Sequence, residues 1–408
     1  MGKKKTKITK ILKTTEKKYN YFPTLIWTTI TIGIILRLIL PFLNVGMSDN
    51  ECGLATNILC REYWGLFNPL NYSQTAPPLF LCLIKFCTTI FPINNTETAN
   101  IIFRTIPLCT GILSIFAFYH LLSNIFINRF VILCGLILFA FNPTLINYAY
   151  ELKPYSTDVL VCILLIFYFV RYNPDGHWRQ FTQTLIISAT SIMFSMPAIF
   201  VICGGLVWIL FKDFRKFFYA ASAFVLFMIF YFVYHLWGVF ETNGARLDQL
   251  WSTFFVTPHN ILSLAQIWTQ YNLNTFVIPL VSLCIIGGGG LIAMFRDKKI
   301  AIIGIATCTS LLCASYLHLF PFAPETCAFL IPLGILLICQ IPDLFSEHFW
   351  GSKIFPIAFI VLVGYNLFFT NAIHNFENNT LVKNRLEPTK HNGCKLIYKT
   401  KVLQKNLF

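Results

Sequence analysis

The 408-residue chain has few charged residues, and acids are the scarcer kind. Only 12% of residues are charged, with 31 lysines and arginines against 17 aspartates and glutamates, whereas soluble domains carry about 25% charged residues. Apolar residues make up 56%, and long apolar runs recur along the chain. This composition excludes an ordinary soluble domain and predicts that most of the chain lies in a lipid bilayer.

Motifs for metal, nucleotide and redox chemistry are also missing. The 14 cysteines lie mostly inside apolar runs and show neither CxxC nor Cys/His zinc spacing, so we expect them to pack as small hydrophobic side chains. Cys52 and Cys60 share one loop, but we do not expect a disulfide between them. The histidines are scattered singly, and the "GGGG" run at 287–290 lacks the Lys-Ser/Thr of a phosphate-binding loop. We therefore expect no metal and no cofactor, and we interpret the glycine run as close helix packing.

Positive charge is concentrated toward the two ends of the chain. Lysines cluster in "MGKKKTKITKILKTTEKK" at the start and again after Asn371. The first cluster fits the positive-inside rule better than nucleic-acid binding, so residues 1–23 are predicted to be a cytoplasmic anchor. No small-residue cleavage site follows the first apolar run, which indicates a retained anchor and not a signal peptide.

The apolar runs predict an all-α polytopic membrane protein with about eleven transmembrane helices, within a domain over residues 24–371. One run differs, because residues 77–91 are shorter than a span needs and include Lys85, so we expect a juxtamembrane helix at the outer surface. The spans are expected at 24–43, 101–122, 130–147, between 158 and 171, at 182–194 and 196–211 (a hairpin broken at Met196-Pro197), and at 217–237, 275–294, 300–318, 326–342 and 353–371.

Short basic loops set the expected orientation. Those predicted to be cytoplasmic are 171–180, 212–216 and 295–299. The first loop (44–100), with its juxtamembrane helices, and the long loop 238–273 then face outside the cytoplasm, as does the acidic stretch 148–158. With eleven spans, the polar tail 372–408 is expected outside as well.

Acidic residues gather in two stretches on this outer side. The first, "DNECGLATNIL", places Asp49 and Glu51 at the water–lipid boundary directly after the first span. A carboxylate in such surroundings can act as a general base toward an acceptor hydroxyl. The same residues can instead fix the topology or cap the helix that begins near Leu54.

The second stretch, "ELKPYSTD", supplies Glu151, Lys153, Tyr155 and Asp158 within eight residues. Lys153 is a cation suited to a lipid phosphate, and Tyr155 can present both a ring and a hydroxyl at the boundary. An ordinary polar interfacial turn is the alternative interpretation.

Two arginines add positive charge near these stretches. Arg37 lies within the first span, where an arginine either snorkels to the surface or marks a site. Arg104 lies near the outer start of the 101–122 helix, where it can meet a phosphate or a lipid headgroup.

Five segments in order resemble a known family and together cover most of residues 30–340. They are "DNECGLATNIL", "LNYSQTAPPLFLCLIKF", "FRTIPLCTGILSIFAFYHLL", "YAYELKPYSTDVL" and "FPFAPETCAFLIPLGILL". The chain resembles the bacterial polyprenyl-phosphate-dependent glycosyltransferases of the GT-C superfamily, the protein mannosyltransferase and aminoarabinose transferase-like group (glycosyltransferase family 39).

The resemblance implies a GT-C fold and an acidic pair, Asp49 and Glu51, that acts on the acceptor. Two positions depart from the family pattern: Asn50 stands where an aspartate is expected, and Glu325 stands where similar segments often carry arginine. The base is therefore either Asp49, by a one-residue shift, or Glu51.

The expected activity is transfer of a sugar from a polyprenyl-phosphate donor to an extracytoplasmic lipid, glycan or protein, with inversion, in the bacterial inner membrane. Contacts to the donor phosphate and sugar are expected from Lys153 with Arg104 or Arg37, and from Glu151, Tyr155 and Asp158. A polytopic transporter or lipid flippase is the alternative from another class, and a GT-C glycan polymerase or ligase is a third. Charges gathered at one face, without related halves, favour the transferase.

Overall fold

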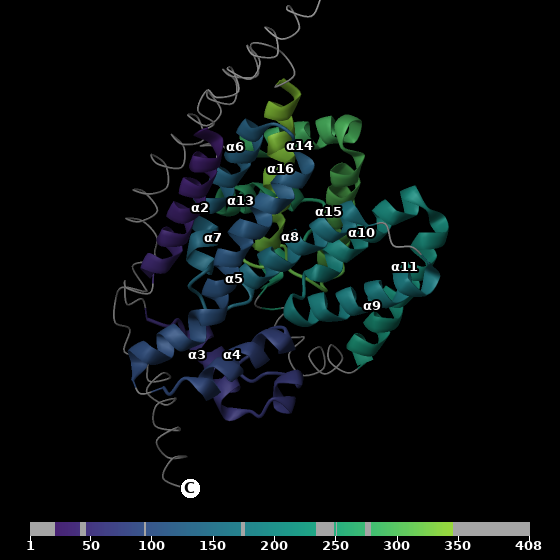
Figure 1. The fold of residues 1–408 in the computed structure, drawn as a ribbon. Helices are drawn as coiled ribbons and strands as arrows, with labels where there is room; N and C mark the ends of the chain where they lie inside the picture. Colours follow the sequence, from purple (N-terminus) through teal and green to yellow (C-terminus); the bar gives the residue numbers. More distant parts are fainter. Residues whose placement is uncertain are drawn as a thin grey trace, which may run out of the picture.

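The computed structural model describes residues 21–40, 46–93, 95–172, 176–233, 249, 251–273 and 279–345. Within these ranges the chain forms helices joined by turns, without a strand (Figure 1). The predicted anchor lies outside them up to residue 20, as do the expected span 353–371, the tail 372–408 and most of 238–250. The all-α fold class is confirmed for the part of the chain that the structure describes.

A bundle of helices makes up the larger part of the molecule. In chain order these are α2 (Tyr21–Ile39), α5 (Thr96–Ile125), α6 (Arg129–Ala140), α7 (Pro143–Tyr148), α8 (Tyr155–Arg171), α9 (His177–Phe194), α10 (Ala198–Lys212), α11 (Phe214–Tyr231), α13 (Ile261–Asn272), α14 (Pro279–Arg296), α15 (Lys298–Tyr316) and α16 (Ile331–Phe345). Short 3₁₀ turns lie at η4 (Ser252–Phe254) and η5 (Ala328–Leu330).

Four helical stretches of the described residues are long and apolar enough to cross a bilayer: Phe22–Ile39, Glu97–Ile125, Phe214–Tyr231 and Lys298–Tyr316. Shorter apolar helices of 10–17 residues accompany them. This supports an integral membrane protein, while the count of eleven spans stays a prediction.

The expected span 130–147 is wrong as a single helix, because the structure divides it into α6 and α7. The break lies at Asn142-Pro143, where the Asn142 side chain accepts a hydrogen bond from the N–H of Leu145 at 3.0 Å and so caps α7. Pro143 fits the first position of a helix, since its missing N–H would have no helical partner there. The Asn142 amide also donates to the carbonyl of Asn272 at 2.6 Å, which fixes α7 to the end of α13.

The break expected at Met196-Pro197 is confirmed, with α9 ending at Phe194 and α10 beginning at Ala198. Helix α9 begins at His177, earlier than the hairpin expected from residue 182. The expected loop 238–273 contains a helix of its own, α13, whose Trp268 indole donates to the carbonyl of Cys327 at 3.0 Å.

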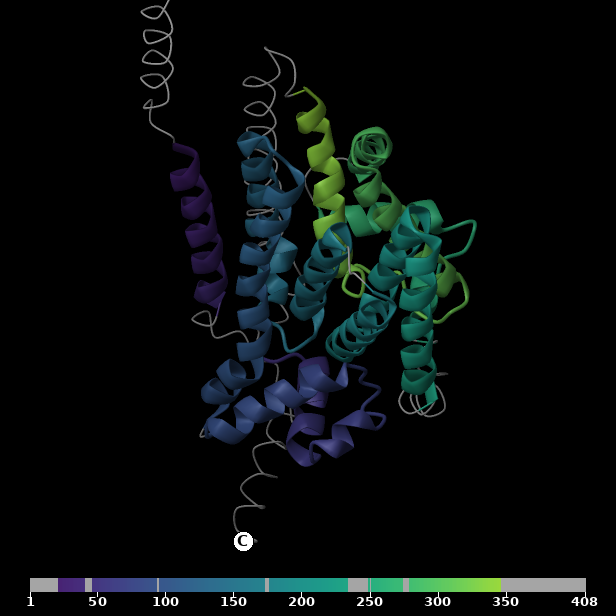
Figure 2. The same ribbon diagram turned by 45° about the vertical axis from the view of Figure 1, so that its right-hand side comes forward.

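Residues 46–93, here called the α3–α4 segment, lie across one end of the bundle (Figures 1 and 2). The segment contains α3 (Asp49–Cys60), the 3₁₀ turn η2 (Trp64–Phe67) and α4 (Pro78–Ile90). It has its own hydrophobic cluster, formed by Leu54, Ala55, Ile58, Leu66, Leu70, Ala76, Phe80, Leu81 and Ile84, to which the bundle contributes Phe103 and Leu152. The 77–91 run is thus a short helix at the end of the bundle.

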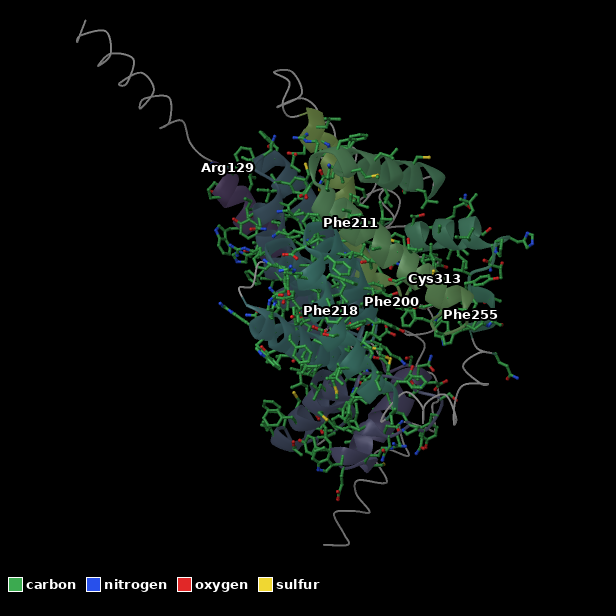
Figure 3. The ribbon with its side chains drawn as sticks, turned by 90° about the vertical axis from the view of Figure 1, so that its right-hand side faces the viewer. Arg129, Phe200, Phe211, Phe218, Phe255 and Cys313 are labelled. Atoms are coloured by element: carbon green, nitrogen blue, oxygen red, sulfur yellow. The ribbon has the colours of Figure 1, made fainter. Side chains whose placement is uncertain are left out.

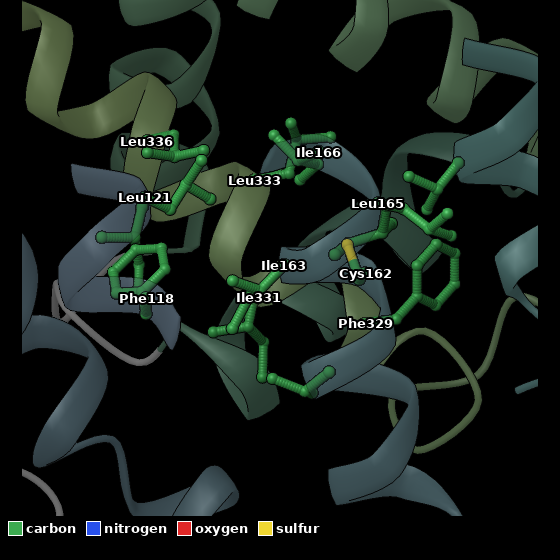
Figure 4. Packing of buried hydrophobic residues seen from close by; sticks show 14 of the residues in the cluster. Phe118, Leu121, Cys162, Ile163, Leu165, Ile166, Phe329, Ile331, Leu333 and Leu336 are labelled. Atoms are coloured by element: carbon green, nitrogen blue, oxygen red, sulfur yellow. The ribbon is translucent and has the colours of Figure 1, made fainter. Parts of the chain in front are cut away.

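The bundle core is built where α5, α8 and α16 meet (Figure 4). Phe118 of α5, Ile163 of α8 and Leu336 of α16 are each fully buried there. Dispersion and apolar burial between these three helices stabilise the bundle, whose one end the α3–α4 segment covers.

One residue of the glycine run packs closely, in part as the sequence predicts. A Cβ at Gly289 would lie 1.9 Å from the carbonyl oxygen of Leu337, so the backbones of α14 and α16 touch at this point. A Cβ at Gly287, Gly288 or Gly290 would meet nothing within 4 Å. The close approach therefore depends on Gly289.

Arg129 marks one end of the bundle, and exposed phenylalanines lie on its surface. Arg129, at the start of α6, lies at the end opposite the α3–α4 segment (Figure 3). Phe211 and Phe218, on α10 and α11, are 71% and 62% exposed, as expected for side chains that face lipid.

Candidate active site

The start of α3 is fixed by a reciprocal cap between Ser48 and Glu51. The Ser48 hydroxyl accepts from the Glu51 N–H, and the Glu51 carboxylate accepts from the Ser48 N–H at 2.9 Å. This capping box satisfies backbone N–H groups that would otherwise have no partner at the first turn. Glu51 therefore helps to cap α3, as one interpretation of the acidic stretch predicts.

Glu51 also forms a buried ion pair with Arg104 of α5. The Arg104 Nε donates to Oε1 at 2.9 Å and its Nη2 donates to Oε2 at 2.8 Å, so the guanidinium holds the carboxylate with two parallel bonds. The side chains are 1% and 0% exposed. Arg104 further donates to the carbonyl of Gly46 at 3.1 Å and lies over the ring of Tyr150.

The same carboxylate binds the loop between α7 and α8, residues 149–154, here called the α7–α8 loop. The Leu152 N–H donates to Glu51 Oε1 at 2.8 Å. Burial raises the pKa of Glu51, but Arg104 and the backbone N–H groups of Leu152 and Ser48 outweigh it, and the net pKa is lowered. Glu51 thus joins the α3–α4 segment, α5 and the α7–α8 loop. Because its pKa is lowered, its carboxylate is a weak base.

Asp49 occupies the first turn of α3 and is exposed. It lies two residues before Glu51 in the same helical turn, on a different face of α3. A carboxylate there is favoured by the positive end of the helix dipole and can be reached by a molecule from solvent. Of the two acids expected to act on the acceptor, Asp49 is exposed and Glu51 is buried.

Lys153 lies next to this junction and is held by the α3–α4 segment. Its ammonium donates to Oε1 of Gln74 at 2.8 Å. Burial lowers the pKa of Lys153, and the carboxylates of Glu151, Glu51 and Glu325 offset that effect in part. The ammonium is thus half-buried at a point where acidic groups from two other segments converge.

Glu325 is one of the three carboxylates that act on Lys153, and the sequence did not indicate that it would lie near this lysine. It precedes η5 and is half-buried; burial raises its pKa, while Lys153 acts in the opposite direction. The position that departs from the family pattern therefore faces the lysine of the "ELKPYSTD" stretch.

The other residues of that stretch lie at increasing depth. Tyr155 is half-buried, and its ring centroid is 4.8 Å from that of Tyr148. Ser156 donates to the carbonyl of Pro107 at 2.9 Å, which joins α8 to α5. Asp158 is 5% exposed, one turn deeper in α8, so it underlies the cluster and does not reach its surface.

Arg37 is separated from the cluster by its own contacts. It is fully buried in α2, and its Nη1 donates to the carbonyls of Gly33 at 3.0 Å and Ala140 at 2.9 Å. These bonds tie α2 to the end of α6. The structure therefore brings Glu51 together with Arg104 and the α7–α8 loop, and it places Asp49 in the same helical turn as Glu51. Arg37 bonds only backbone carbonyls of α2 and α6 in these contacts and does not join them.

Two further sequence expectations can be compared with the structure. Cys60 is exposed with a free thiol, so it does not pair with Cys52. Within the described ranges, no group of three His, Cys, Asp or Glu side chains is arranged to hold a metal ion. Gln74 was missed by sequence reasoning, although it lies within one of the segments that carry the family resemblance.

Comparison with known proteins finds likeness only among solved structures. No protein-family model and no curated protein sequence matches the chain. The oligosaccharyltransferase of Archaeoglobus fulgidus in its apo form is 12% identical, with a TM-score of 0.54 over 86% of this chain and 55% of that one. The same enzyme in complex with zinc and sulfate is 14% identical, with a TM-score of 0.51 over 84% and 51%.

This chain spans about half the length of those enzymes. At such low identity the likeness shows the fold alone, and it does not show membership of glycosyltransferase family 39. Over most of its own length, the chain thus shares the fold of part of that oligosaccharyltransferase.

Proposed function

We propose that the protein is a membrane glycosyltransferase that moves a sugar from a polyprenyl-phosphate donor to an extracytoplasmic lipid, glycan or protein, with inversion. The observation that carries the proposal is the junction of two polar segments that the sequence places about a hundred residues apart. Glu51 binds the Leu152 N–H at 2.8 Å, and Gln74 binds the Lys153 ammonium at 2.8 Å. These bonds hold Lys153 beside the segment that begins with Asp49, at one end of a fold shared with an oligosaccharyltransferase.

Asp49 is the proposed general base. It is exposed, whereas the oxygens of Glu51 are occupied by hydrogen bonds from Arg104, Ser48 and Leu152. A carboxylate engaged in this way, with a lowered pKa, would have to break its bonds before it could take a proton. Glu51 and Arg104 then orient the junction and do not touch the reacting atoms.

Lys153 is the proposed contact for the donor phosphate. An ammonium carries three N–H donors, and Gln74 accepts from one of them. The others are suited to phosphate oxygens, and the charge stabilises the negative charge that develops on the leaving phosphate. Glu151 and Glu325 act electrostatically on both Lys153 and Tyr155. These two acids and Tyr155 are proposed to contact the sugar, with Asp158 supporting them from below.

The proposed reaction is a single displacement. Asp49 accepts the proton of the acceptor hydroxyl as that oxygen attacks the anomeric carbon. The bond between the anomeric carbon and the phosphate oxygen breaks, and the lipid phosphate leaves with the electron pair beside Lys153. One displacement inverts the anomeric configuration. The step uses the protein's own acid and cation, and a divalent metal is not part of the proposal.

The reaction is proposed to take place outside the cytoplasm, in a bacterial inner membrane. Arg129 marks the bundle end opposite the α3–α4 segment, and the positive-inside rule favours the cytoplasm for such basic ends. The partners are then the bilayer, the lipid-linked sugar and an outer acceptor, with no nucleic acid.

The direct test is sugar transfer in membranes supplied with a radiolabelled polyprenyl-phosphate sugar. Asp49→Asn is expected to lower transfer by at least a hundredfold, since general-base catalysis contributes about 10²–10⁴-fold. Glu62→Gln, an exposed acid of the same segment, serves as the matched control and should keep transfer. Full transfer in Asp49→Asn would remove Asp49 as the base.

A separate measurement tests the proposed contact between Lys153 and the donor phosphate. Lys153→Met is expected to raise the KM for the donor lipid, whereas Lys85→Met, which removes a half-buried lysine of α4, should leave that KM unchanged. Transfer from a lipid-diphosphate oligosaccharide alone would indicate a polymerase or ligase. Movement of the lipid across the bilayer without a new glycosidic bond would indicate a flippase.

A further inference from the structure

Gln74 is a buried amide whose two ends are both engaged. It is 7% exposed; its Oε1 accepts from the Lys153 ammonium at 2.8 Å, and its Nε2 donates to the carbonyl of Tyr72 at 3.2 Å. Because a primary amide has a donor end and an acceptor end, the bond to Tyr72 decides which end faces the lysine. Gln74 therefore presents an oxygen to Lys153 in a fixed direction.

The turn that carries Gln74 has an unusual backbone. Tyr72 and Ser73 have φ values of 61° and 52°, in the left-handed region that residues other than glycine rarely occupy. Such conformations cost about 1–3 kcal/mol each and persist only where the surroundings impose them. The Gln74 N–H closes the turn by donating to the carbonyl of Asn71 at 3.3 Å.

Helix α3 imposes this conformation. Asn57 donates from its amide to the carbonyl of Asn71 at 3.1 Å and accepts from the Asn71 N–H at 2.9 Å, which clamps the start of the turn. One helical turn earlier, Gly53 leaves room for it, since a Cβ there would lie 3.3 Å from Tyr72 Cβ and 3.5 Å from Gln74 Nε2. One face of α3 thus holds the strained turn in place.

We propose that Gln74 is the positioning residue of Lys153: the strained 71–74 turn, clamped by α3, aims the Gln74 carbonyl oxygen at the ammonium and so directs its remaining N–H groups to the donor phosphate. This inference rests on the proposed function for the role of Lys153, but the contact between Gln74 and Lys153 can be tested without sugar transfer. Gln74 acts through the lysine and touches no reacting atom.

The contact is expected to control the charge of the lysine. Burial already lowers the pKa of Lys153, and a hydrogen bond accepted by a neutral amide oxygen favours the charged form. Removing the oxygen should lower the pKa further and increase the fraction of neutral amine. A carboxylate in its place should raise the pKa and decrease that fraction.

The first experiment measures the acylation rate of Lys153 in membranes at pH 8 by peptide mass spectrometry. Gln74→Leu should raise the rate about three- to tenfold, since one pKa unit changes the neutral fraction about tenfold. Gln74→Glu should lower it, and Gln266→Leu, a half-buried glutamine of α13, should leave it unchanged. A turn that had merely come apart would expose the lysine and raise the rate in both Gln74 variants, which would overturn the proposal, as would no change in either.

The second experiment is a kinetic double-mutant cycle. Gln74→Leu should lower kcat/KM for the donor about tenfold, with a higher KM as part of the loss, because a lost hydrogen bond to a charged group is of that order. Gln74→Leu combined with Lys153→Met should be no worse than Lys153→Met alone, since both act through one group. Additive effects, or a fall in kcat with unchanged KM, would refute the positioning role.

The two experiments separate the two proposals. If wild-type membranes transfer no sugar while the acylation rates change in opposite directions, the proposed function fails and the Gln74–Lys153 contact stands. If transfer depends on Asp49 and Lys153 but Gln74→Leu is indistinguishable from wild type in both assays, the positioning role fails alone.

Discussion

The contrast between Asp49 and Glu51 gives the sharpest test of the site. The two acids lie two residues apart on α3, and each can be converted to its amide with almost no change of shape. We expect Glu51→Gln to destabilise the protein strongly, and Asp49→Asn to leave it folded but inactive. The prediction separates an acid that holds the structure from one that reacts.

The magnitude for Glu51 follows from its surroundings. Glu51→Gln removes the charged carboxylate that pairs with the guanidinium of Arg104, a side chain that is 1% exposed. Breaking a buried ion pair from one side costs about 3–5 kcal/mol, because a buried charge remains uncompensated. The Leu152 N–H can still donate to the amide oxygen, so the loss concerns mainly the charge.

The corresponding cost for Asp49 is small. Its side chain is exposed at the first turn of α3, where the interaction of a carboxylate with the helix dipole is worth about 0.3–1 kcal/mol. The two substitutions should therefore differ by about 2 kcal/mol or more in the free energy of unfolding.

The assay is thermal unfolding of the detergent-purified protein, followed by sugar transfer measured below the unfolding transition. A double variant, Glu51→Gln with Arg104→Gln, should lose less stability than the sum of the two single changes, because the second change removes the unpaired charge. If Glu51→Gln unfolds at the wild-type temperature but transfers no sugar, while Asp49→Asn stays active, then Glu51 is the base and our argument from its hydrogen bonds is wrong.

Further predictions concern pH, packing and orientation. The pKa of Glu51 is lowered in the folded protein, so its ionised form contributes fully to stability above the ordinary pKa of 4.5. That contribution is lost as the pH falls through the folded pKa. The unfolding temperature of the wild type should therefore fall below about pH 4.5, and that of Glu51→Gln should fall less. Gly289→Ala should destabilise by about 1–3 kcal/mol, because the methyl group would meet the Leu337 carbonyl, whereas Gly288→Ala should be neutral or stabilising, as urea unfolding of purified protein can measure. Cys60 should react in intact cells with a membrane-impermeant maleimide, and labelling only after permeabilisation would reverse the proposed orientation.

Much of the fold could be predicted because apolar runs and helix breakers are local signals. The break at Pro197 and the helical character of residues 78–90 followed from composition and length. The division of the 130–147 run at Asn142-Pro143 did not, because two short helices and one long one share the same hydropathy. It is fixed by the bond from Asn142 to the end of α13, which lies 130 residues away in the chain.

The sequence by itself determined that this is a helical membrane protein with two acidic stretches flanking apolar runs, since the bilayer requires such runs and repels charge elsewhere. Only the tertiary structure decided the surroundings of each acid: Arg104 and the Leu152 N–H bind Glu51, while Asp49 is exposed. It also decided that Lys153 donates to Gln74 and lies near enough to Glu325 to lower its pKa. Burial, charge pairing and hydrogen bonding depend on which distant residues come together, and no local pattern carries that information.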